Sequence, residues 1–284
     1  MATGPLVIHH GSPNFWLSPD IWVTLSGQPN TPPGVANPIV GTTYDVQVRV
    51  ENKSSSVVDD WTMFVCWAIP TLGGIPLTDI SLAQQLNNNG ITVPPGPNHI
   101  FQAANTWTPT FENHGHECLI AVVYWEGLPF PFPSLNGDAG PDQSWSIAQH
   151  NLGVVQAPIH PRRFHYTFQA CNGADEERLF VVAARQAPLS EIAAFLPGVP
   201  GGRGLIDKPG KVERLGIVAS AKPDPGELEA ATAVLSPVKI APRSCRLFTL
   251  SGALEEGGAL INVTQSLDER VVGGLSVLVI AETK

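Results

Sequence analysis

The sequence predicts an all-β protein that consists of two tandem antiparallel β-sandwiches, with at most one or two short helices. Alternating or apolar segments recur along the 284 residues, separated by turn residues to which glycine and proline contribute 27 each. Charged residues make up 14% of the chain, against about 25% in an average soluble domain. A chain of this length accommodates about two domains, and each half is long enough to bury its own core.

The strands expected in the first half either alternate in hydrophobicity or form short apolar runs. Tyr44, Val46, Val48 and Val50 share one face of a strictly alternating segment, which is typical of a half-buried strand. The segment 78–90 predicts a short helix or a loop. The other expected strands are 20–26, 59–70, 99–109, 118–125 and 142–156.

The second half shows the same pattern without an obvious sequence repeat. Residues 190–198 are expected to form a single short helix that Ser190 caps and that Pro197 and Gly198 end. Strands are expected over 163–172, 178–186, 214–221, 232–240, 244–254, 258–267 and 271–282. This many short strands in one half of the chain is typical of a β-sandwich.

Two independent properties change near residue 157, and this change predicts a domain boundary. Residues 1–157 contain two basic and eleven acidic residues, for a net charge of −9, together with all seven tryptophans. The remainder has fourteen residues of each charge. Pro158 and Pro161 interrupt the joining segment, since proline blocks both helix and ladder continuity. The predicted parts are an N-terminal arm over 1–17, a first sandwich over 18–157 and a second over 158–284.

Five motifs of the first half occur in an order that is typical of a known family. They are "SPDIWV" at 18–23, "YDVQVRVENKSSS" at 44–56, "TMFVCWAIP" at 62–70, "GHECLIAVV" at 115–123 and "SWSIAQHNLGVV" at 144–155. Residues 18–156 together resemble the CARDB-like immunoglobulin-type modules of bacterial proteins. The resemblance implies an immunoglobulin-like sandwich with a role in adhesion or assembly, and it implies no catalytic residues. The second half looks only generally immunoglobulin-like.

A cluster of histidine and cysteine side chains precedes the apolar run at 118–125. His114, His116 and Cys118 would share one face of an extended chain, and imidazole and thiolate are both zinc ligands. The spacing of the other histidines points to no further ligand. The alternative is a turn that enters a core strand, with Cys118 packed as a small hydrophobe. The family resemblance favours this structural role, so we expect neither a metal nor any other cofactor.

The four cysteines divide equally between the halves. Cys66 and Cys118 belong to the first half, Cys171 and Cys245 belong to the second, and none forms a C-x-x-C motif. Because the N-terminus shows no signal peptide, free thiols inside strands are expected. One cross-strand disulfide in each half is the alternative. The same reasoning predicts a protein that stays in the cytoplasm or is exported by a route that needs no signal peptide.

Apolar side chains near loops are the candidates for contacts with other molecules. Phe15 and Trp16 lie in the N-terminal arm, which is expected to be a mobile tail or to dock on a neighbouring subunit. Phe130 and Phe132 lie in an extended Pro-Phe segment that suits packing on another subunit. Trp107 lies near a loop, where an exposed ring could stack on a sugar, although most tryptophans are expected to anchor the core.

These features favour a non-enzymatic structural or assembly protein. It would self-associate as a homo-oligomer, or dock into a larger complex, through its arm, its apolar loops and its sheet edges. An adhesion or carbohydrate-binding module that uses exposed aromatics is the alternative, and a metal enzyme at His114 and His116 is a third hypothesis. No apolar run approaches the roughly 20 residues of a membrane span, and a net charge of −9 disfavours nucleic acid.

Overall fold

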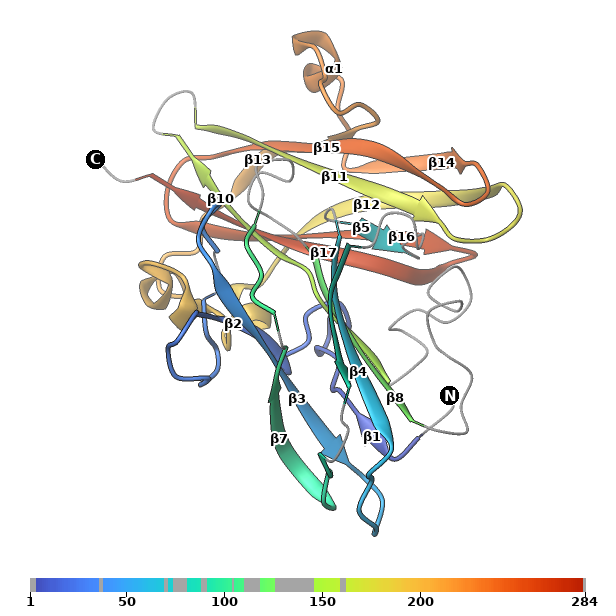
Figure 1. Cartoon of the computed structure of the whole chain (residues 1–284). Helices are drawn as coiled ribbons and strands as arrows, with labels where there is room; N and C mark the ends of the chain where they lie inside the picture. The colour runs from blue at the N-terminus through green and yellow to red at the C-terminus, as the bar shows by residue number, and fades with distance from the viewer. Residues whose placement is uncertain are drawn as a thin grey trace.

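The structure is a computed structural model of the chain. It describes residues 4–35, 38–68, 71–73, 81–87, 91–103, 105–109, 118–125, 146–158 and 162–282, with the backbone path alone for residues 73 and 81–87. Four sheets pack in pairs, so that the chain forms two β-sandwiches (Figure 1). This architecture confirms the predicted all-β class. No helix among the described residues is long and apolar enough to cross a membrane.

The first sandwich packs one sheet centred on β3 against another centred on β4 and β8. In the first sheet, β3 (Tyr44–Asn52) pairs antiparallel with β1 (Leu6–Val7), β2 (Ile21–Leu25) and β7 (Gly96–Gln102). The second sheet has the order β6 (Ser81–Asn87), β4 (Trp61–Ala68), β8 (Cys118–Trp125) and β9 (Ile147–His150). The alternation read from the sequence places Val46, Val48 and Val50 in the shared core. The segment 81–87, for which a helix or loop was expected, forms strand β6 because it pairs with β4.

The second sandwich packs a four-stranded sheet against a five-stranded sheet. The four-stranded sheet has the order β13 (Val212–Val218), β15 (Ser244–Leu254), β11 (Arg163–Asn172) and β5 (Thr71–Gly73). The five-stranded sheet has the order β10 (Leu152–Ala157), β17 (Arg270–Ala281), β16 (Gly258–Leu267), β12 (Arg178–Ala187) and β14 (Val234–Ile240). Phe168 and Phe248 stack in its core with ring centroids 5.6 Å apart.

Two strands that precede residue 158 belong to sheets of the second sandwich. Strand β5 pairs with β11, and β10 pairs with β17 along its whole length. Both pairings are parallel, whereas the other named strand pairs are antiparallel, so the sandwiches are not purely antiparallel. The backbone hydrogen bonds of these pairs join the halves into one structural unit. The division into two domains at residue 157 remains a prediction. The sheets of the second sandwich contain strands from both sides of that residue.

The helical segments are short and differ from the sequence expectation. Residues 190–198 form two 3-10 turns, η4 (Leu189–Ile192) and η5 (Leu196–Gly198), in place of one helix. Ser190 lies inside η4 and caps nothing, because Pro188 holds the N-cap position without a side-chain bond. A third turn, η6 (Gly202–Gly204), follows, and the α-helix α1 (Pro225–Glu229) begins with a capping box.

Candidate functional site

The N-terminal arm is an integral part of the fold. Leu6 and Val7 form β1, which pairs with Glu51 and Asn52 of β3, and the side chain of Ile8 is fully buried. The expectation of a mobile tail or of a tail docked on a neighbouring subunit is therefore wrong for residues 5–17. The physical reason is that the arm finds an apolar surface on its own chain, where its exposed area is removed from water.

Trp16 anchors this arm on the five-stranded sheet of the second sandwich, on the face that points away from the core of that sandwich. Its side chain is 4% exposed and packs beside Leu152, Leu260 and Leu278, together with the buried side chains of the 3-10 turns. Gly274 makes room for the indole, since a Cβ atom there would lie 2.3 Å from a ring carbon of Trp16. The apolar area of Trp16 is thus used within the chain, and Phe15 beside it is partly buried in the same cluster.

A continuous chain of hydrogen bonds fixes the orientation of the arm. The Trp16 Nε1–H donates to Ser276 Oγ at 2.9 Å, and Ser276 Oγ donates to Asn262 Oδ1 at 2.7 Å. The Nδ2 atoms of Asn262 and Asn14 both donate to Glu191 Oε2, at 2.8 and 2.6 Å. Asn14, Ser276 and Asn262 are buried, so these bonds satisfy polar groups that would otherwise destabilise the interface. The network therefore selects one position of the arm.

A second polar cluster ties the start of the arm to β2 and β3. Asp20 is 1% exposed and accepts hydrogen bonds from the His9 backbone N–H at 2.9 Å and from Arg49 Nε at 2.6 Å. The His9 ring lies between two carboxylates, with Nδ1 2.7 Å from Asp20 Oδ2 and Nε2 2.8 Å from Glu51 Oε2. A buried carboxylate needs partners of this kind. These residues therefore have a structural role in the docking of the arm.

The cysteine that was a candidate metal ligand is a buried core residue. Cys118 and Cys66 are free thiols on the β6–β4–β8–β9 sheet, on the face that points away from the first core, where they pack with Ile120 and Ile147. Burial raises the pKa of each thiol to about 12, so neither is a thiolate near neutral pH. His114 and His116 lie outside the described residues, so the expectation that they hold no metal stays a prediction. Among the residues that are described, no group of three or more potential metal ligands comes together.

The aromatic candidates for contacts with other molecules fall into two groups. Trp107 is 2% exposed and packs in the first core against Tyr44, to which it is also joined by two backbone hydrogen bonds of 2.8 Å. Its indole therefore offers no platform on which a sugar could stack. Phe130 and Phe132 lie outside the described residues, so their proposed role in packing remains a prediction.

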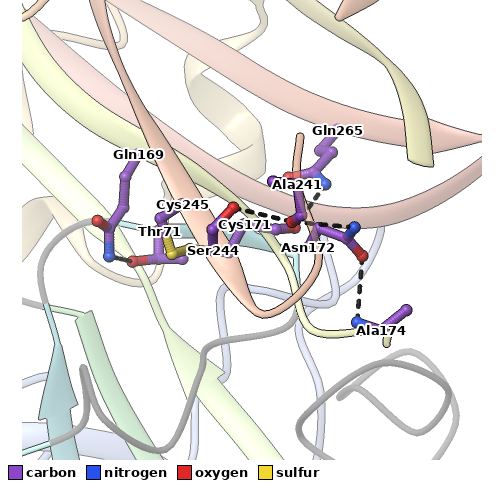
Figure 2. The surroundings of a disulfide bond; sticks show 9 residues. All are labelled: Thr71, Gln169, Cys171, Asn172, Ala174, Ala241, Ser244, Cys245 and Gln265. Carbon is purple, nitrogen blue, oxygen red and sulfur yellow. Dashed lines mark hydrogen bonds between the residues drawn. A yellow bond between two sulfur atoms is a disulfide. The ribbon is translucent and has the colours of Figure 1, made fainter. Parts of the chain in front are cut away.

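The second pair of cysteines forms a disulfide across β11 and β15 (Figure 2). The prediction of free thiols is wrong here, because the strand register places Cys171 directly opposite Cys245. Around the bond, Gln265 Nε2 donates to the Cys171 carbonyl at 2.9 Å, and Gln169 Nε2 donates to Thr71 Oγ1 at 2.8 Å. Since Thr71 belongs to β5, the disulfide lies where a strand of the first half joins the second sandwich.

Several edge strands carry features that hinder pairing with another chain. Strand β13 is bulged between Glu213 and Gly216, and Ile217 N–H donates to Thr232. Strand β14 contains Pro237, which has no N–H to donate. Along β2, the Val23 carbonyl accepts from Val35 N–H at 2.8 Å. The Gln149 carbonyl of β9 accepts from Ser18 N–H at 2.8 Å.

Strand β7 differs from these edges, because its outer side is open in the described part of the chain. It pairs with β3 alone (Figure 1). Ala103 N–H donates to Val46 of β3, so by antiparallel alternation the N–H and C=O groups of Ile100 and Gln102 point away from the sheet. The Ile100 side chain is 39% exposed. The site that sequence reasoning missed is thus a sheet edge, which only the strand order reveals.

Comparisons with known proteins identify no family for this chain, and its fold is defined by its own sheets. No family model and no curated protein matches the chain. The red sea bream transglutaminase is 12% identical, with a TM-score of 0.25 over 93% of this chain and 31% of that chain. CBD12 from CALX1.2 is 11% identical, with a TM-score of 0.19 over 80% and 76% of the two chains. Escherichia coli alpha-2-macroglobulin is 10% identical, with a TM-score of 0.24 over 92% and 22%.

The chain spans about a third of the length of the transglutaminase. With TM-scores of 0.19 to 0.25 and identities of 10 to 12%, these likenesses say nothing about the function of this chain.

Proposed function

We propose that this chain is a non-enzymatic structural or assembly protein that associates with a second copy of itself through the open edge of β7. The observation that carries the proposal is the outward direction of the Ile100 and Gln102 backbone groups, on the regular part of the edge that follows Pro97 and the bulge near Asn98. Strand addition at such an edge supplies backbone hydrogen bonds and so gives affinity without a pocket.

A twofold axis is the simplest symmetry for this contact. In a symmetric antiparallel pair, Ile100 of one copy would lie opposite Gln102 of the other, and each would exchange backbone hydrogen bonds with its partner. The bulge near Asn98, where φ is 68°, limits the regular part of β7 to residues 99–102. The contact is therefore short, and we expect association to be reversible and dependent on concentration.

The chemistry of the described side chains supports a structural role. The Cys66 and Cys118 thiols have pKa values raised to about 12, which disfavours nucleophilic attack by either. The carboxylate of Asp20 is held by His9 and Arg49 as part of the docked arm. We also propose that residues 18–156 form a CARDB-like module, and the order of the five sequence motifs supports this assignment.

Sedimentation velocity over a range of protein concentrations tests the proposal. Ile100→Pro removes the outward N–H donor but leaves the β3-facing groups of His99 and Phe101, so it should abolish concentration-dependent association. Ile100→Val keeps the donor and should leave association unchanged. Leu179→Ala removes an exposed apolar side chain from β12, whose two edges are both paired, and is the control for general surface hydrophobicity. A wild type that remains monomeric at high concentration, or equal association of the Ile100→Pro variant, would refute this function.

A further inference from the structure

A cavity of about 530 Å³ lies on the outer face of the β13–β15–β11–β5 sheet. Figure 1 shows β11, β13 and β15 at the opposite end of the molecule from β7. Arg163 and His165 of β11, Arg214 of β13 and Ser251 of β15 line it from the sheet. Leu228 and Glu229, at the end of α1, line it from the opposite side. Its size falls in the range of sites for small organic ligands, which is roughly 300–1,000 Å³.

The wall that carries α1 is attached to the sheet at both ends. Thr249 Oγ1 donates to the Ser220 carbonyl at 2.7 Å before the helix, and Ile217 N–H donates to the Thr232 carbonyl at 2.8 Å after it. Gly216 lets the segment approach closely, because a Cβ atom there would lie 2.5 Å from that of Ala231. The cavity is therefore formed before any ligand arrives, which lowers the cost of binding.

Two arginines, Arg163 and Arg214, line the floor of the cavity. Arg163 and His165 share one face of β11, opposite Ala253 and Ser251, whose small side chains leave the space above β15 free. Arg214 lies in the bulge of β13 with a φ of 50°, which redirects its side chain relative to a regular strand. Neither arginine forms an ion pair with any residue that the structure describes.

The geometry points to a binding site for a hydroxylated organic anion, such as a sugar acid or a sugar phosphate, free or as a unit of an anionic polysaccharide. The oxyanion group lies between Arg163 and Arg214, because planar guanidinium groups recognise carboxylate and phosphate oxygens through paired hydrogen bonds. The carboxylate of Glu229 and the hydroxyl of Ser251 accept hydrogen bonds from ligand hydroxyls. Leu228 covers the less polar side of the ligand.

The charge balance of the cavity makes binding depend on pH. Partial burial and the charge of Arg163 lower the pKa of His165, so its ring is neutral in the free protein at neutral pH. The other charged groups near it are Arg214 and Glu213 of β13 and Glu229 of α1. A bound carboxylate, which stays ionised in this range, favours the protonated ring, so the affinity for glucuronate should rise as the pH falls from 7 toward 5.5.

Isothermal titration calorimetry of the full chain tests this site. Glucuronate and glucose 6-phosphate are the probes, and glucose is the neutral control. We expect the anions to bind and glucose not to bind. Arg163→Gln and Arg214→Gln should each weaken binding by about tenfold or more, since a hydrogen bond to a charged group is lost. Arg246→Gln, the same charge change on β15 outside the cavity, should leave binding unchanged.

Three results would overturn the proposal of an anion site, and two others identify the source of the ligand. Equal binding of glucose, unchanged binding in both cavity variants, or no binding of either anion at millimolar concentration would overturn the proposal. A glucuronate-containing polysaccharide that binds more tightly than the monosaccharide identifies the polymer as the source, and equal affinity per sugar identifies the free molecule. The Ile100→Pro variant should bind the anions normally, so failure at this site and failure of edge association are distinguishable.

Discussion

Removal of the Trp16 indole should destabilise the whole protein, because this ring joins the arm to the second sandwich. Trp16 is 4% exposed, and a buried tryptophan removes roughly 150–250 Å² from water. At about 25 cal/mol per Å², and with allowance for the remaining methyl group, Trp16→Ala should cost about 4 kcal/mol, in line with large-to-small changes in other cores. An entropy of unfolding of about 2.1 cal/mol/K per residue converts this loss into a fall in Tm of about 7 °C for one cooperative unit.

A double-mutant cycle with Gly274 makes the prediction specific to the contact. Gly274→Ala places a Cβ atom 2.3 Å from the Trp16 ring, so it should cost about 1–3 kcal/mol in the wild-type background. In the Trp16→Ala background the new methyl group enters the space that the indole has left, so its cost should fall to near zero. Gly204→Ala is the control, since a Cβ atom there meets nothing within 4 Å.

Urea unfolding followed by tryptophan fluorescence and by far-UV circular dichroism measures all four variants. We expect a coupling free energy of at least about 1 kcal/mol between the two positions, because the effects of mutating residues in contact are not additive. Additive effects, or a Trp16→Ala variant as stable as the wild type, would show that the arm is not docked as described. Two separate transitions in the wild type would refute the claim that the shared strands unite the halves.

Three further predictions concern the cysteines and a histidine. Replacement of Cys171 and Cys245 by serine should lower the free energy of unfolding by up to about 4.4 kcal/mol, as the chain-entropy model gives for a sequence separation of 74 residues; an unchanged midpoint of chemical unfolding would contradict the cross-link. Cys66 and Cys118, with pKa values of about 12, should resist iodoacetamide at pH 8 in the folded protein and react after unfolding, which mass spectrometry detects. Burial lowers the pKa of His150, so unfolding takes up a proton; its contribution to stability is complete above about pH 6.5 and falls as the pH drops below that value. His150→Gln should therefore flatten the fall in Tm between pH 7 and 5, and an identical slope would count against this assignment.

Local sequence patterns predict many of the strands, because a strand that is buried on one face alternates between apolar and polar residues. The alternation at Val46, Val48 and Val50 specifies the core face of β3, and the apolar run 118–125 is β8 over its full length. The arm was expected to be a mobile tail or to dock on a neighbouring subunit, whereas it packs on its own chain. What the sequence does not contain is the identity of the covering surface, since Ser276 lies 260 residues from Trp16.

The errors share a cause, which is that they depend on register and strand order. Cys171 and Cys245 form a disulfide because ten residue pairs of β11 and β15 align them, and no spacing rule reveals that alignment. Residues 152–156 were expected within a strand of the first half over 142–156, but the parallel partner of β10 is β17, which lies at the far end of the chain. The cavity arginines were missed for the same reason, because Arg163 of β11 and Arg214 of β13 lie on opposite sides of the intervening strand β15.

Amide hydrogen exchange along β7, read at several protein concentrations, is the most direct test of the proposed association. The His99 and Phe101 amides face β3 and should be protected at every concentration. The Ile100 and Gln102 amides point outward, so they should exchange rapidly in dilute protein and become protected as the concentration rises. Rapid exchange of Ile100 and Gln102 at all concentrations would contradict the account, because an edge that pairs with a second copy cannot leave these amides open to water.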